Sequence, residues 1–193
     1  MRRLFYALFL VLLVTLTACT PALDWREVRF EGAMPASQAS QLNAVLPCKP
    51  DRATREQTVG GQKVQLSMMG CKAAGATFTL SRMVLATPAT APQVLAAWQA
   101  ASLGLPAGAK VATQPIKILG ASAWPPAVQT PVPSAGASVD AAMKSAKMSG
   151  QIAWFAQTAG TELVLYQAAV YGSDTAAVGS EATTTFFESL RLP

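Results

Sequence analysis

Apolar and polar positions alternate most clearly on either side of Gly60–Gly61. The flanking segments Thr54–Val59 and Gln62–Gly70 have the length and pattern of β-strands. In the second segment, the apolar side chains that share a face are Val64, Leu66 and Met68. Two glycines between extended segments are typical of a two-residue hairpin turn, because the favoured turns need positive φ. The pattern predicts a β-hairpin, followed by a third strand over Ala76–Ala86.

A second hairpin is predicted near the C-terminus, where Gln151–Gln157 and Glu162–Tyr171 flank the turn Thr158–Thr161. Both segments carry apolar side chains on both of their faces. Strands with this pattern are covered on both sides. We therefore expect this hairpin at the centre of a sheet.

Weaker alternation predicts short edge strands over Trp25–Glu31 and Lys110–Leu119. Pro115 favours an edge position for the second of these, because proline has no N–H to donate to a neighbouring strand. Met34–Leu46 is rich in alanine, serine and glutamine, and we expect a loop with a helical turn near Ser37–Ala44.

The clearest helical period covers Thr90–Gly104, with Thr90 as a candidate N-cap and Gly104 as a stop signal. Its apolar stripe consists of Val94, Leu95, Trp98 and Ala101. A tryptophan on such a stripe is usually a core residue. A closing helix is predicted over Ser173–Leu190. The side chains expected to dock it on the sheet are Phe186, Phe187 and Leu190.

The N-terminus has a different pattern. Arg2 and Arg3 precede an unbroken apolar run, Leu4–Val14, and small residues follow up to Cys19. This order of charged, apolar and small residues is that of a secretory signal. The run is shorter than the roughly 20 apolar residues that a membrane-spanning helix needs. An uncleaved anchor helix, or a signal cleaved at another position, is the alternative interpretation.

Leu16–Cys19 resembles the lipobox of bacterial lipoproteins. The resemblance implies that Cys19 receives a diacylglyceryl group, that cleavage precedes it, and that its new amine is acylated, with chains such as palmitate. Several acyl chains make a stable membrane anchor where one chain would not. Thr20 follows the cysteine where aspartate would favour inner-membrane retention, so the resemblance implies the periplasmic face of the outer membrane.

The expected organisation is a signal helix over residues 1–18, a lipidated tether over 19–24 and a single domain over 25–193. Residues 120–138 are rich in proline and alanine, and we expect a loop there because too little chain follows for a second domain. For Val139–Met148, a short helix and the start of a strand both stay open.

Cys48 and Cys71 remain once Cys19 is assigned to lipid. Thiols of exported proteins usually pair in the oxidising compartment. A metal or redox site is the alternative, but the chain has no histidine and no Cys-x-x-Cys sequence. We therefore expect a structural disulfide that clamps the open end of the first hairpin.

The formal net charge of +5 includes the two arginines of the signal. Nucleic-acid binding needs clustered basic residues. Here only Lys49, Arg52 and Arg55 lie close together, and we interpret them as a solvated loop face. No nucleic-acid partner is expected.

The absence of histidine excludes catalysis by Ser-His-Asp or Cys-His sets and most catalytic zinc sites. No phosphate-binding or dinucleotide-binding glycine pattern is present. The carboxylate pairs Glu27 and Glu31, and Glu181 and Glu188, lie on segments that look like exposed faces. Candidate Ser–Lys-type pairs, Lys144–Ser145 and Ser81–Arg82, are too common to indicate a nucleophile. We predict no catalytic, cofactor-binding or metal-binding residues.

Three short stretches carry a resemblance to a known family. They are the turn Pro47–Pro50, the apolar stretch Leu165–Val170 and the closing stretch Thr185–Leu192. All three are similar to stretches of PsbP-like domains. The resemblance implies an α+β fold in which an antiparallel β-sheet is sandwiched by helices, and binding or assembly rather than catalysis. The cysteine pair and the proline-rich loop depart from the plant members, so no photosystem role is implied. The chain resembles a proteobacterial lipoprotein with a PsbP-like domain.

Two functions follow as hypotheses. The first is a lipid-anchored periplasmic binding or accessory domain of the cell envelope, with an envelope protein or the cell wall as partner. The alternative is an envelope hydrolase that acts on lipid or glycan. A cleft holding two or more carboxylates with strongly perturbed pKa values would favour the hydrolase. A flat or apolar groove would favour the binding domain.

Overall fold

A seven-stranded antiparallel sheet forms the centre of the molecule, with strands in the spatial order β3-β4-β5-β9-β8-β7-β6. The computed structural model describes residues 23–31, 41–106, 108–132, 149–173 and 175–193. The strands of this sheet are β3 (Asp51–Val59), β4 (Gln62–Ala73), β5 (Ala76–Leu85), β6 (Gln114–Pro115), β7 (Val128–Val132), β8 (Ser149–Ala159) and β9 (Glu162–Gly172).

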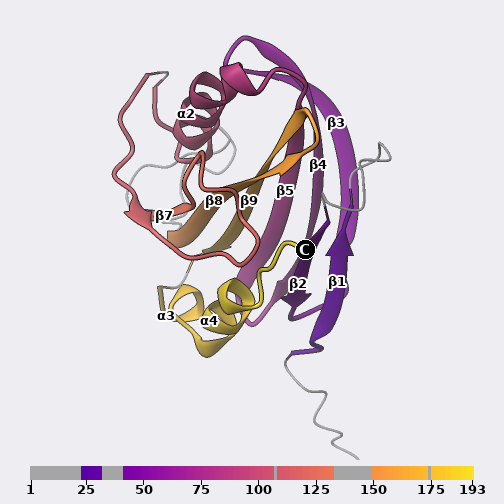
Figure 1. Cartoon of the computed structure of the whole chain (residues 1–193). Coiled ribbons are helices and arrows are strands. Elements are labelled where there is room, and N and C mark those ends of the chain that lie inside the picture. The colour runs from indigo at the N-terminus through magenta and orange to yellow at the C-terminus, as the bar shows by residue number, and fades with distance from the viewer. Residues whose placement is uncertain (1–22, 32–40, 107, 133–148, 174) are drawn as a thin grey trace, which may run out of the picture.

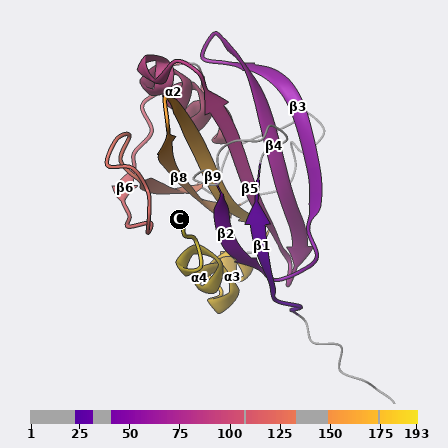
Figure 2. The same ribbon diagram turned by 45° about the vertical axis from the view of Figure 1, so that its right-hand side comes forward.

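A separate two-stranded antiparallel sheet and a few short helices complete the fold (Figures 1 and 2). These elements are β1 (Arg26–Phe30), β2 (Leu42–Leu46), α2 (Ala91–Ser102) with the 3₁₀ turn η2 (Pro88–Thr90) before it, α3 (Thr175–Val178) and α4 (Glu181–Glu188). In both views α2 lies near the end of the large sheet that carries the β3–β4 and β8–β9 turns, and α3 and α4 lie at the opposite end. The described part is therefore α+β with a mostly antiparallel sheet.

Both predicted hairpins are confirmed. In the first, Gly60 and Gly61 have φ of 56° and 77°, the left-handed conformation that a two-residue turn between right-twisted strands requires. The second hairpin pairs β8 with β9, and β9 is the middle strand of the seven. All residues of Leu163–Val170 are buried, so the prediction of a strand covered on both faces is also confirmed.

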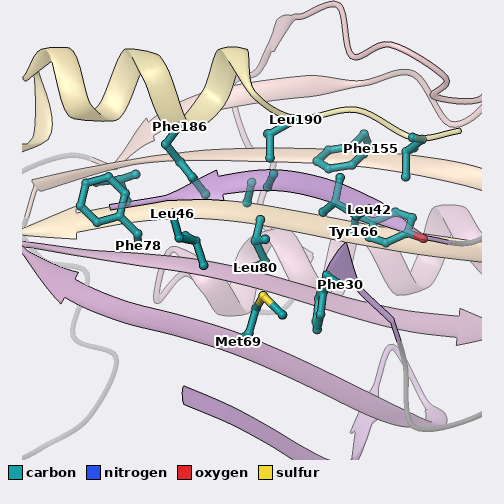
Figure 3. Close-up of a cluster of buried hydrophobic side chains, with 14 of the residues drawn as sticks. Phe30, Leu42, Leu46, Met69, Phe78, Leu80, Phe155, Tyr166, Phe186 and Leu190 are labelled. Atoms are coloured by element: carbon teal, nitrogen blue, oxygen red, sulfur yellow. The ribbon is translucent and has the colours of Figure 1, made fainter. Parts of the chain in front are cut away.

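One face of the large sheet packs against β1, β2, α4 and the C-terminal tail (Figure 3). Phe186 of α4 is fully buried there, with its ring centroid 5.6 Å from that of Phe78 in an edge-to-face arrangement. The fully or almost fully buried members of this core include Phe30, Leu42, Leu46, Met69, Phe78, Leu80, Phe155, Tyr166 and Phe186. Every second side chain of each strand points to this face, and together these side chains form one continuous core.

The opposite face packs against α2. Val94 and Trp98 are both buried, in a cluster with strand residues such as Leu66, Met83 and Leu165. Trp98 is thus a core residue at the helix–sheet interface, as its position on the apolar stripe predicts. The two buried clusters lie on opposite faces, because consecutive residues of a strand point to opposite sides.

Two strands were not expected from the sequence. Leu42–Leu46, predicted as part of a loop with a helical turn, is strand β2 and pairs with β1 over Arg26–Phe30. Val128–Val132 lies inside the predicted loop 120–138 but forms β7 and pairs with β8. In both cases pairing with a strand distant in sequence overrides a weak local pattern.

The predicted helices have different ends in the structure. α2 begins at Ala91, and Thr90 occupies its N-cap position, but the Thr90 side chain makes no capping bond and its hydroxyl donates to the carbonyl of Thr87 at 2.8 Å. The closing helix is broken into α3 and α4 around Gly179 and Ser180, since glycine is a poor helix former and serine favours a helix start. Of the predicted strand Lys110–Leu119, only Gln114–Pro115 forms a strand, at the sheet edge, and Leu119 makes an isolated bridge with Arg191.

The predicted disulfide between Cys48 and Cys71 is present. Cys71 lies near the end of β4, and Cys48 lies in the connection between β2 and β3. The bond therefore joins the connection that leaves the two-stranded sheet to the open end of the first hairpin.

Several predictions concern residues outside the described ranges. These are the signal helix and Cys19, the segment Val139–Met148, and the parts of the predicted loops at residues 34–40 and 133–138. Among the described residues, no helix combines the length and the apolar character needed to cross a bilayer.

Candidate functional site

A cleft of about 450 Å³ lies between α2 and the adjacent strands of the sheet. Its volume falls within the range of about 300–1,000 Å³ that is usual for small-molecule sites. α2 contributes Trp98, Ala101 and Ser102. The strand residues that line it are Arg55, Gln57, Leu66, Met68, Lys72, Thr77, Thr79, Ser81, Gln167 and Tyr171. These come from β3, β4, β5 and β9, so the cleft is assembled from segments that are distant in sequence.

The strand register orders the cleft into rows. Met68, Ser81 and Gln167 are direct cross-strand neighbours on β4, β5 and β9. Lys72, Thr77 and Tyr171 form another such row, farther along the same three strands. Directly paired residues have Cβ atoms about 4.5–5.5 Å apart, so each row presents its side chains side by side.

The row next to α2 is held by hydrogen bonds. The Gln167 amide Nε2 donates to the Ser102 hydroxyl oxygen at 2.6 Å, and that hydroxyl donates to the carbonyl of Trp98 at 2.8 Å. These bonds tie the last turn of α2 to the central strand. They hold α2 in place over part of the cleft.

The row farther from α2 carries a neutral phenol. Burial raises the pKa of Tyr171 to about 12. The hydroxyl therefore stays protonated at neutral pH and can donate a hydrogen bond into the cleft.

Two positive charges line the cleft, those of Arg55 and Lys72. The predicted exposure of Lys49, Arg52 and Arg55 is confirmed, but the prediction that they share one loop face is wrong for the last two. Both lie on strand β3, where alternation sends them to opposite faces of the sheet. Arg52 donates to the carbonyl of Arg29 at 3.1 Å on the face of β1, whereas Arg55 lines the cleft.

None of the described residues that line the cleft is an aspartate or a glutamate. The predicted exposure of the candidate carboxylate pairs is confirmed, because Glu27, Glu31, Glu181 and Glu188 are all exposed. Within the described ranges, no three of the cysteine and acidic residues lie together in a way that could hold a metal ion. The cleft thus offers hydrogen-bond donors and positive charge, without the paired carboxylates that glycoside hydrolysis uses.

Ser81 and Arg82 do not form a pair. They are adjacent on β5 and therefore point to opposite faces, with Ser81 in the cleft and Arg82 in the other core. Burial lowers the pKa of Arg82, and the nearby Tyr166, Glu162 and Glu31 act in the opposite direction. Arg82 is 2% exposed, and its Nε and Nη2 have no hydrogen-bond partner among the described residues. It does not line the cleft, and we assign it no binding role.

Another hollow, of about 460 Å³, lies where β7 and β8 approach α3. Val132 and Ser149 contribute to it. These residues border the stretch 133–148, which lies outside the described ranges. We therefore argue no site from this hollow.

The cleft was not identified from the sequence. A signal does exist in β5, where Thr77, Thr79 and Ser81 carry hydroxyls on the face that Met83 and Leu85 share. A run of hydroxyl side chains on one face of a buried strand indicates a surface that is not fully covered. The placement of α2 over only part of this face could not be predicted from that pattern.

Comparison with known proteins adds no relative. No protein-family model, curated protein or solved structure matches the chain.

Proposed function

We propose that the chain is a lipid-anchored binding or accessory domain of the bacterial cell envelope, held at the periplasmic face of the outer membrane through Cys19. The observation that carries binding is the cleft under α2, which has the volume of a small-molecule site and a lining of apolar, hydroxyl and cationic side chains. The anchor is proposed from Leu16–Cys19 and the apolar run that precedes it. An envelope protein stays a proposed partner.

The finer assignment of the fold is also a proposal. An antiparallel sheet with α2 on one face and α4 on the other supports the PsbP-like arrangement that the short sequence stretches suggest. The signal helix is proposed from Arg2, Arg3 and Leu4–Val14. The hydrolase alternative gains no support from the cleft, because its described lining supplies no carboxylate.

The anchor predicts a clear result in cells. Wild-type protein should incorporate a clickable palmitate analogue and be processed, whereas Cys19→Ser should remain an unlabelled precursor. Thr20→Asp is the matched control, because it keeps the acceptor sulfur and should keep the label while moving the protein to the inner-membrane fraction. Equal labelling of the wild-type and Cys19→Ser proteins would contradict the lipid assignment.

The binding role predicts that the mature protein carries a small molecule. Protein purified from its own cells should release that molecule on denaturing extraction, and mass spectrometry should detect it in proportion to protein. Ala101→Trp should abolish its recovery, because Ala101 is an exposed residue of α2 that lines the cleft, and an indole there would occupy the space.

Ala96→Trp provides the control. Ala96 is also exposed on α2 but does not line the cleft, so this variant should retain the molecule. Thermal unfolding of both variants checks that each is folded. If the same molecules are recovered from wild type and Ala101→Trp, the cleft is not the binding site and the proposed function fails.

A further inference from the structure

The large apolar side chains of the cleft and the ammonium group of Lys72 lie at different ends. Leu66, Met68 and Trp98 provide its large apolar side chains, and they lie toward α2. At the far end, the row Lys72, Thr77 and Tyr171 provides an ammonium group and two hydroxyls. The end under the helix therefore holds the large apolar side chains beside Arg55 and Gln57, and the end beyond it holds Lys72 with two hydroxyls.

The two ends lie far enough apart to hold an elongated molecule. Leu66 and Lys72 are on the same strand, β4, and each residue of an antiparallel strand adds about 3.4 Å, so they are separated by about 20 Å. That length accommodates an alkyl chain of medium length together with its head group.

In the middle of the cleft, the sheet carries only small side chains. The row between the two ends consists of Gly70, Thr79 and Ala169, which are direct cross-strand neighbours. The Thr79 hydroxyl donates to the carbonyl of Ala169 at 3.3 Å, which holds it down against the sheet. Gly70 has no side chain, and a Cβ there would come within 2.6 Å of the Phe78 carbonyl oxygen. Small residues in this row leave a path between the two ends.

No described residue balances the two positive charges in the cleft. Arg55 and Lys72 line it, and neither forms an ion pair with a described residue. No described acidic residue lines the cleft. An ammonium group beside two hydroxyl donors matches a carboxylate or phosphate, which accepts charge-assisted hydrogen bonds.

We propose that the cleft binds an amphipathic small-molecule anion, with its carboxylate or phosphate at Lys72, Thr77 and Tyr171 and its apolar body running toward Trp98. This inference rests on the proposed binding function and specifies its ligand class. Lys72 supplies the charge and Tyr171 a neutral hydroxyl donor. Arg55, at the other end on edge strand β3, favours negative charge only at longer range.

The test is equilibrium dialysis of the mature, lipidated protein in lipid nanodiscs, with empty nanodiscs as the blank. The labelled probes are decanoate, decyl phosphate and decanol, which share one chain and differ in the head group. Decanoate or decyl phosphate should bind the wild-type protein more tightly than decanol does, and the tighter of the two identifies the head group.

Lys72→Gln should weaken binding of the preferred anion about tenfold, or roughly 1.4 kcal/mol, because the variant loses a hydrogen bond between charged groups. Tyr171→Phe should weaken it by a smaller factor, and Arg55→Gln less than Lys72→Gln. Lys63→Gln is the matched control, because Lys63 is exposed on the same strand, β4, but does not line the cleft, and this variant should bind as wild type does.

Equal binding of decanol and the anions, unchanged in Lys72→Gln, would overturn the anionic class while leaving the cleft as a binding site. A larger loss in Arg55→Gln than in Lys72→Gln would overturn the assigned orientation. Failure of all three probes to bind wild type would overturn the amphiphile class. The proposed function itself fails only in the extraction experiment with Ala101→Trp, so the two failures are distinguishable.

Discussion

Truncation of Phe186 to alanine should lower the free energy of unfolding by about 3–5 kcal/mol, the usual cost of removing a buried phenylalanine ring. Phe186 is fully buried, with ring contacts to Phe78 and Phe187 at centroid distances of 5.6 Å and 5.1 Å. It is the aromatic residue that joins α4 to the large sheet (Figure 3). Because a folded domain has a total stability of only about 5–15 kcal/mol, this loss is large. Urea denaturation followed by circular dichroism measures it.

Neighbouring residues of α4 provide controls for this prediction. Phe187 is half-buried, so Phe187→Ala should cost less than Phe186→Ala, and the exposed Glu188→Ala should change the midpoint little. The aromatic pair could instead serve as an exposed partner-binding surface, but complete burial of Phe186 opposes this reading. A Phe186→Ala variant with a near-normal urea midpoint would show that the ring does not stabilise the core.

The parts of the fold that were predicted correctly are encoded locally. Gly60–Gly61 fixes a turn because only its backbone adopts positive φ without strain, and the strands on either side pair immediately. The apolar stripe of Thr90–Gly104 likewise specifies α2 from residues within one helix. Such elements need no knowledge of distant segments.

The parts that were missed depend on distant partners. In β2, the backbone N–H of Asn43 donates to the carbonyl of Arg191 at 2.9 Å, and the N–H of Val45 donates to the Ser189 hydroxyl at 2.8 Å. The composition of this stretch suggests a helical turn. Its hydrogen bonds to the C-terminal tail stabilise it as a strand instead. In β7, Pro131 is compatible with a strand because the short β6 pairs only with the start of β7, which leaves that side open.

The break between α3 and α4 has a signal in the sequence from which it could have been predicted. Gly179 disfavours a continuous helix, and Ser180 followed by Glu181 is typical of a new helix start with an acidic first turn. The cleft is different, because Lys72 and Thr77 become neighbours through a local turn, whereas Tyr171 joins them only when β9 inserts beside β5. No sequence pattern within a single segment predicts that row.

Reduction of the Cys48–Cys71 disulfide should lower the free energy of unfolding by about 3 kcal/mol. The bond spans a sequence separation of 23 residues. In the chain-entropy model, closing a loop of this size lowers the entropy of the unfolded chain and so destabilises the unfolded state by about 3 kcal/mol. Cys71 belongs to the buried core and Cys48 packs against it, so the two thiols of the reduced protein should stay in place as small apolar groups. The cost therefore arises mainly in the unfolded state.

Urea denaturation with and without reductant measures the effect. The double variant Cys48→Ala, Cys71→Ala is the control, because it should have the lower midpoint in both conditions and show no response to reductant. Thiol counting on the denatured, unreduced mature protein should find no reactive cysteine, since Cys19 is expected to carry lipid through its sulfur and the other two cysteines are bonded to each other. Two reactive thiols per chain in the exported protein, together with a midpoint that reductant does not change, would show that the bridge does not form in the cell.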